Sequence, residues 1–190
     1  SRALTKIDVY SGFLGAGKTT LIRKMIAEGY GKQKLVLIEN EFGEIGIDGG
    51  FLQEAGIEIR EMNSGCICCS LVGDFGKALE QVIDQYHPDR ILIEPSGVGK
   101  LSDVVAAVKK VTNDEVQLGY TVAVADAGKC KVYMRNFGEF YNNQIETAST
   151  IVLSRTDSIS QEKLDGAVAL LREHNAVATM VTFFTAATTS

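Results

Sequence analysis

Three of the four cysteines lie within four positions, at Cys66, Cys68 and Cys69, in the stretch GCICCS. Thiolates are soft ligands that suit Zn²⁺ and other late transition metals, and three of them leave a fourth coordination position for water or a transfer partner. Cys66 and Cys68 would point to one side of an extended segment. We expect Cys69 to reach the same point where a helix begins, near the positive helix end, which lowers a thiol pKa. The spacing favours a transition-metal site. A redox pair of Cys66 with Cys69 and buried structural thiols are the alternatives.

Residues 12–19 read GFLGAGKT and match the phosphate-binding pattern G-x-x-x-x-G-K-[ST]. An apolar strand is predicted before them, at residues 7–10, and a helix after them, at residues 19–27. Glycines let backbone N–H groups turn inward around phosphate oxygens, and the helix N-terminus adds about half a positive charge. Lys18 would reach the β- and γ-phosphates, and the Thr19 hydroxyl would bind Mg²⁺. The nucleotide contacts expected from this loop are those of Gly12, Gly15, Ala16, Gly17, Lys18, Thr19 and Thr20.

Carboxylates end two further predicted strands, at residues 34–39 and 90–94. Ligands of parallel α/β sheets lie at these carboxyl ends. Glu94 is expected to hold Mg²⁺ through water, and a turn at residues 95–97 would bring the Gly97 N–H to the γ-phosphate. Residues 39–48 would form a switch loop, in which Glu41 or Glu44 orients the attacking water. A solvated strand end or acidic loop is the alternative.

The stretch Ser154-Arg155-Thr156-Asp157 follows a predicted strand at residues 150–154. GTP-binding proteins commonly use Asn-Lys-x-Asp here. The Asp157 carboxylate would accept hydrogen bonds from guanine N1–H and the 2-amino group, a donor pair that adenine lacks. Arg155 would stack on the base through its planar guanidinium. These residues favour GTP over ATP, and an N-cap or turn role for Asp157 is the alternative.

Strands alternate with helices along the rest of the chain. Further helices are predicted at residues 75–86, 101–111 and 160–173, and further strands at 57–61, 119–125 and 179–184. Strands separated by helices imply crossover connections and a mainly parallel sheet. We therefore predict an α/β, three-layer P-loop NTPase fold with a central sheet flanked by helices. The 190 residues suit a single domain, 1–190.

Composition narrows the classes of partner. The formal net charge of −5 gives no positive field for nucleic acid or an anionic membrane. The sequence has no run of 18 or more apolar residues, so a membrane-spanning helix is not expected. Clustered cysteines do not resemble a disulfide framework, so a reducing, cytoplasmic location is expected.

Together these motifs resemble the CobW-like family of metal-handling GTPases, relatives of UreG and HypB. The resemblance rests on residues 12–21 (GFLGAGKTTL), 39–48 (ENEFGEIGID), 65–71 (GCICCSL) and 94–97 (EPSG), with weaker matches at 124–127 (VADA), 154–157 (SRTD) and 175–178 (NAVA). It implies a GTPase domain whose Cys-x-Cys-Cys motif binds a metal, often zinc or cobalt, and passes it to a client protein. The family commonly has lysine where Arg155 stands and asparagine or a similar residue where Ser154 stands. Its members usually continue into a C-terminal domain, which these 190 residues lack.

The function expected is that of a GTP-hydrolysing metallochaperone that uses GTP and Mg²⁺. GTP would order the switch loops and bring the thiolates into ligand geometry, and hydrolysis would release the metal to the client. A P-loop kinase for a small metabolite and a non-enzymatic metal-binding or thiol-switch module are the alternatives. The residue types do not choose among Zn²⁺, Co²⁺ and Ni²⁺, and they leave a metal-dependent homodimer open.

Overall fold

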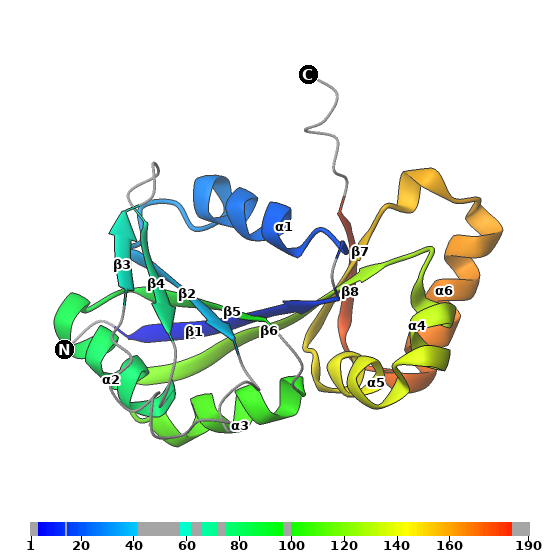
Figure 1. Ribbon diagram of the computed structural model, residues 1–190. Helices are drawn as coiled ribbons and strands as arrows, with labels where there is room; N and C mark the ends of the chain where they lie inside the picture. Colours follow the sequence, from blue (N-terminus) through cyan, green and yellow to red (C-terminus); the bar gives the residue numbers. More distant parts are fainter. Residues whose placement is uncertain are drawn as a thin grey trace. The chain divides into compact units, whose positions relative to one another are not determined.

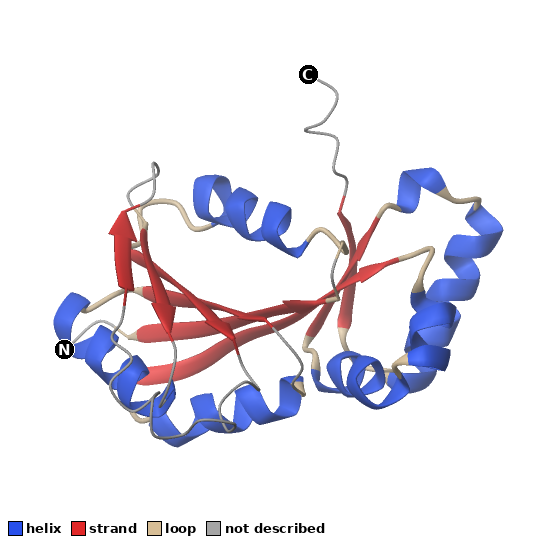
Figure 2. Ribbon diagram, viewed as in Figure 1, coloured by secondary structure: helices blue, strands red, loops and turns tan. Residues whose placement is uncertain are grey.

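The computed structural model describes residues 4–13, 15–41, 58–61, 66–71, 75–96 and 100–183 (Figures 1 and 2). The chain divides into two compact units. The first comprises Ser1–Val9, Met25–Gly99 and Asp103–Tyr120, and the second comprises Tyr10–Lys24, Lys100–Ser102 and Thr121–Ser190. The expected carboxylates and clustered cysteines belong to the first unit, and the phosphate loop and base loop to the second.

Within the described residues eight strands form one sheet, in the order β3-β4-β2-β5-β1-β6-β7-β8. The strands are β1 (Thr5–Gly12), β2 (Leu35–Glu41), β3 (Glu58–Glu61), β4 (Ile67–Leu71), β5 (Arg90–Ser96), β6 (Val116–Asp126), β7 (Thr150–Ser154) and β8 (Thr179–Phe183). The pairs β1/β5, β2/β5, β2/β4, β6/β7 and β7/β8 are parallel, whereas the edge strand β3 is antiparallel to β4. The mainly parallel sheet is therefore as predicted.

Helices connect most of the parallel strands (Figure 2). The α-helices are α1 (Lys18–Lys24), α2 (Phe75–Tyr86), α3 (Leu101–Val111), α4 (Cys130–Asn136), α5 (Gly138–Thr147) and α6 (Gln161–His174). A π-helical turn at Met25–Gly29 continues α1, and a 3-10 turn at Thr156–Ser158 follows β7. No helix in the described part of the chain is long and apolar enough to cross a bilayer.

A buried charged network organises the first unit. The fully buried Asp8 carboxylate accepts hydrogen bonds from Arg90 Nη1 at 2.7 Å, from the Tyr30 hydroxyl at 2.8 Å and from the Tyr120 N–H at 2.7 Å. The Arg90 guanidinium also lies 4.9 Å from the centre of the Tyr30 ring and 5.9 Å from that of Tyr120. One carboxylate thus ties together β1, β5, β6 and the segment after α1.

In the second unit α4, α5 and α6 lie against one another (Figure 1). Their apolar side chains form a buried core together with those of β6 and β7. Asn175, at the end of α6, fastens the segment that leads into β8. Its amide donates to the carbonyls of Ile145 at 2.9 Å and Ala148 at 2.8 Å, while its side-chain oxygen accepts from the N–H of Ala178 at 2.9 Å. A buried carboxamide therefore satisfies backbone groups of three segments at once.

Three elements differ from the sequence-based expectation. β4 was not predicted, and α4 and α5 were not predicted either. The turn expected at residues 95–97 is wrong in its first part, because β5 continues through Pro95 and Ser96. Proline's fixed φ is compatible with an extended strand end, so Pro95 does not require a turn.

Candidate functional site

The phosphate loop lies between β1 and α1, the context that its sequence pattern requires. Gly15 and Gly17 have φ of 81° and 97°, a region that side chains with a Cβ rarely adopt. The Ala16 N–H donates to the Phe13 carbonyl at 3.0 Å, and the Leu21 N–H begins the helical ladder on the Gly17 carbonyl at 3.0 Å. This backbone can direct amides and the start of α1 at a phosphate group.

Phe13, a variable position of the loop pattern, anchors the loop in an aromatic cluster. Its ring centre lies 5.1 Å from that of Tyr133, 5.6 Å from Phe137 and 5.2 Å from Tyr141, the last two in edge-on geometry. Such pairs contribute about 0.5–1.5 kcal/mol each beyond area burial. The sequence pattern leaves this position free, so the anchor was missed.

The base loop follows β7. Arg155 has φ of 57°, and Asp157 is exposed within the 3-10 turn. Ser154 is fully buried, and its hydroxyl donates to the Ala125 carbonyl at 3.4 Å, so this side chain holds the loop to β6.

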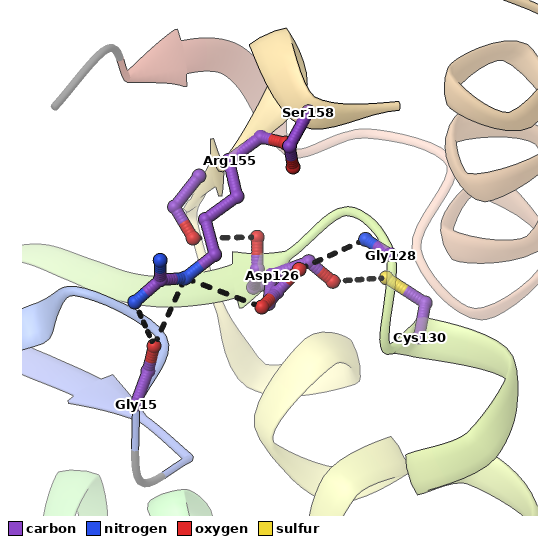
Figure 3. A network of polar contacts seen from close by, with 8 residues as sticks. Gly15, Asp126, Gly128, Cys130, Arg155 and Ser158 are labelled. Atoms are coloured by element: carbon purple, nitrogen blue, oxygen red, sulfur yellow. Dashed lines mark hydrogen bonds and ion pairs between the residues drawn. The ribbon is translucent and has the colours of Figure 1, made fainter. Parts of the chain in front are cut away.

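Arg155 joins the base loop to the phosphate loop (Figure 3). Its Nε and Nη2 donate to the Gly15 carbonyl at 3.3 and 2.9 Å, and its Nε lies 3.4 Å from Asp126 Oδ2. The contacting residues are 140 positions apart in the chain. The expected stacking of Arg155 on a base stays a prediction, and the contact with Gly15 is an additional role that the sequence did not indicate.

The two strand-end carboxylates of the first unit come together. Glu39 of β2 and Glu94 of β5 are register partners, so their side chains leave the sheet on the same face, and both are half-buried. Glu41 ends β2 opposite Ser96. Glu44 and Gly97 lie outside the described residues, so their expected roles stay predictions.

The cysteines lie at and within β4. Cys66, Cys68 and Cys69 are all buried, and β4 pairs Cys68 with Leu37 and Cys69 with Ile38 of β2. Because side chains alternate along a strand, Cys68 and Cys69 point to opposite faces of the sheet. The expectation that Cys69 lies where a helix begins is wrong, since α2 begins only at Phe75.

Cys68 forms a hydrogen bond with a carboxylate. Its Sγ donates to Glu39 Oε1 at 3.4 Å. No group of three His, Cys, Asp or Glu side chains within the described ranges is arranged to hold a metal ion. Glu39 is therefore a candidate ligand that the cysteine spacing alone did not indicate.

Burial governs the thiol acidities. It raises the pKa of Cys66 to about 11, the hydrogen bond with the Leu37 backbone opposes this rise, and the charge of Cys69 adds to it. Burial also raises the pKa of Cys69. The lowered pKa expected from a helix terminus is thus reversed, because desolvation favours the neutral thiol. All four cysteines are free thiols.

A family model and several curated relatives match most of this chain. The model of the CobW/HypB/UreG nucleotide-binding domain matches residues 6–182. The zinc chaperone YeiR of Escherichia coli (strain K12) is 32% identical over 162 residues, which cover 84% of this chain and 49% of that protein. The zinc chaperone YjiA of the same strain is 31% identical over 182 residues, covering 92% of this chain and 57% of that protein. The chain spans about half the length of the curated relatives it matches.

Solved structures confirm the P-loop NTPase fold. Zn(II)-bound YjiA GTPase from E. coli aligns with a TM-score of 0.75 at 28% identity, covering 96% of this chain and 58% of that one. HypB from Helicobacter pylori in complex with nickel aligns with a TM-score of 0.55 at 12% identity, covering 96% of this chain and 79% of that one, a likeness that shows the fold alone. The phosphate loop, the mainly parallel sheet and the match over residues 6–182 lead to one conclusion: the chain belongs to the CobW/HypB/UreG family, whose nucleotide-binding domain it carries.

Proposed function

We propose that the protein binds and hydrolyses GTP and couples hydrolysis to the transfer of a transition metal, zinc or cobalt, to a client protein. The observation that carries this proposal is a row of side chains across three neighbouring strands. Cys68 of β4 donates to Glu39 of β2, and Glu39 is the register partner of Glu94 of β5. A candidate metal thiol is thus hydrogen-bonded to a carboxylate whose register partner is the residue expected to bind Mg²⁺.

The residues of the phosphate loop fit a nucleotide with its Mg²⁺. Two glycines with positive φ shape the loop, and Lys18 and Thr19 open α1. Thr19 would hold Mg²⁺ directly and Glu94 through water, and the ion would supply charge neutralisation at the phosphates. Lys18 would contact the outer phosphates, and Glu41 would orient the attacking water. The base loop would read guanine through Asp157.

The transferred metal ion would bind Cys68 and Glu39 first, because these two side chains already lie on one face of the sheet and are hydrogen-bonded. Soft thiolate and carboxylate together suit Zn²⁺ and Co²⁺. Cys69 leaves β4 on the other face, so its participation requires a local change in β4. Cys66, beside the first residue of that strand, would complete the set of three thiolates.

Coupling would act through Glu39. A nucleotide that orders Glu94 would bias the neighbouring Glu39 and thereby the Cys68 thiol. Allosteric coupling is typically about 1–3 kcal/mol, which changes an affinity about 5–150-fold. Structural thiolate zinc sites bind with about 10–16 kcal/mol, so coupling of this size would not empty a tight site alone. A receiving client is therefore part of the proposal, and the free thiols suit a reducing cytoplasm.

The test is a Zn²⁺ titration against a competing chelator, with a non-hydrolysable GTP analogue or with GDP, together with phosphate release. We expect the two Zn²⁺ affinities to differ at least about fivefold, and Glu39→Gln to abolish the difference. Replacement of Cys66, Cys68 and Cys69 by serine should remove Zn²⁺ binding, while the matched control Cys130→Ser should keep it. Equal Zn²⁺ affinities with the two nucleotides would remove the coupling, and unchanged Zn²⁺ binding in the triple variant would remove the thiol site.

A further inference from the structure

Asp126 lies in the second unit at the end of β6, beside the end of β7 and just before the turn at Gly128. It ends β6, and its register partner in β7 is Ser154, the residue before Arg155. Its side chain is only 13% exposed. One carboxylate oxygen accepts from the Gly128 N–H at 2.9 Å, which fixes the rotamer, and the other faces Arg155 Nε at 3.4 Å (Figure 3).

Arg155 uses this support to reach the phosphate loop. Its side chain is half-exposed, so packing alone does not hold it, yet two of its nitrogens converge on the Gly15 carbonyl. A flexible arginine loses about 2 kcal/mol of rotamer freedom when it is held in one geometry. A mostly buried carboxylate, held by the Gly128 N–H and lying beside Nε, offsets part of that loss before any ligand binds.

We propose that Asp126 is a positioning residue for nucleotide binding, which holds the Arg155 guanidinium against the phosphate loop at Gly15. This inference rests on the proposed function, because it concerns the affinity for a guanine nucleotide. The loop that would read the base and the loop that would bind the phosphates become one preorganised unit. Asp126 itself contacts neither the base nor the phosphates in this account, and it acts only through Arg155.

The chemistry of the pair explains why arginine suits this position. The planar guanidinium offers Nη2 to the Gly15 carbonyl while its Nε faces both that carbonyl and Asp126. A lysine has a shorter reach and carries its three donors on one atom instead of on a planar fork, so it would hold Gly15 and Asp126 together less well. Arg155→Lys should therefore bind nucleotide less tightly than the native protein and should respond less to the loss of the Asp126 charge.

The experiment measures the Kd for GDP with Mg²⁺ by titration calorimetry, using the full chain. Asp126→Asn keeps an acceptor for the Gly128 N–H and removes the charge that faces Arg155. We expect it to weaken GDP binding about two- to fivefold, the range for a half-exposed ion pair. Arg155→Met should weaken binding about tenfold. Asp114→Asn, at an exposed aspartate in the turn before β6, is the matched control for one lost charge and should bind as the native protein does.

The decisive variant carries Asp126→Asn and Arg155→Met together. If Asp126 acts through Arg155, the double variant binds GDP as Arg155→Met does, and melting temperatures without nucleotide stay unchanged. An additive loss of GDP affinity would overturn the inference, as would native affinity in Asp126→Asn. If the native protein itself bound no GDP or GTP, the proposed function would fall and this inference with it. If the native protein binds GDP and Asp126→Asn binds it equally tightly, only the positioning role of Asp126 is refuted, and the proposed function stands.

Discussion

The Asp8 network gives the sharpest stability prediction. Asp8→Ala removes the carboxylate partner of Arg90, whose side chain is only 14% exposed, and takes an acceptor from the Tyr30 hydroxyl and the Tyr120 N–H. Breaking a buried pair from one side costs about 3–5 kcal/mol, because the remaining charge keeps its desolvation penalty. Arg90 keeps a hydrogen bond from Nε to Gln33 at 3.2 Å and its two ring contacts, so we expect a loss of about 4 kcal/mol rather than the upper limit.

The assay is urea unfolding at pH 7, with the free energy of unfolding from linear extrapolation and an unchanged m-value. The melting temperature should fall by about 8–16 °C, given about 2–4 °C per kcal/mol for a chain of this size. Asp8→Asn, which keeps one acceptor and the shape, should cost about half as much.

A double-mutant cycle with Arg90→Met separates the pair from its surroundings. When Arg90 is replaced by methionine, removing the Asp8 carboxylate no longer leaves a buried cation without its partner. The double variant should therefore lose at least about 1 kcal/mol less free energy of unfolding than the sum of the two single variants. A cost below about 1 kcal/mol for Asp8→Ala, or strict additivity, would refute the reasoning.

Three further predictions follow from single positions. A Cβ on Gly119 would clash with Asp8 Oδ1, so Gly119→Ala should lower the free energy of unfolding by about 1–3 kcal/mol, measured by urea unfolding. Gly166 lies on α6 with open space around it, so Gly166→Ala should raise the free energy of unfolding slightly in the same assay. Burial raises the pKa of the Cys66 thiol from 9.0 to about 11 in the folded protein. Its contribution to the free energy of unfolding should therefore be complete below pH 9 and should decline between pH 9 and 11. A Cys66→Ser variant whose free energy of unfolding declines equally over this range would show that Cys66 is not the cause. Asp157→Asn exchanges an acceptor for a donor, so nucleotide competition should show weaker GTP binding and a relative gain for a xanthine nucleotide, which carries a carbonyl at C2; an unchanged preference would exclude Asp157 from base reading.

Local patterns predicted the parts of the fold that are contiguous in sequence. The loop at residues 12–19 lies between β1 and α1 as expected, since its glycines and its flanks are read from neighbouring residues. The apolar strands and the amphipathic helix α3 follow equally local periodicity, and α3 spans Leu101–Val111 as predicted. The register of Glu39 with Glu94 follows from the rule that parallel strands place their carboxyl ends together.

Contacts between distant segments could not be predicted in this way. Three cysteines in four positions fit a loop, a helix start or a strand, and only pairing with β2 decides that Cys68 and Cys69 face apart. The same holds for Arg155, because the end point of a long side chain depends on a loop 140 positions away. The helix α5 has aromatic and polar residues where a regular apolar stripe would have revealed it.

The left-handed backbone at Arg155 has an evolutionary consequence. A side chain with a Cβ adopts φ of 57° at a cost of about 1 kcal/mol, which glycine would avoid. Glycine would strain the backbone less at this position, so Arg155 lowers the stability of the fold while supplying a side chain that reaches the Gly15 carbonyl. Directed evolution for heat resistance should therefore find Arg155→Gly readily, and the resulting proteins should be harder to melt and poorer at holding their nucleotide.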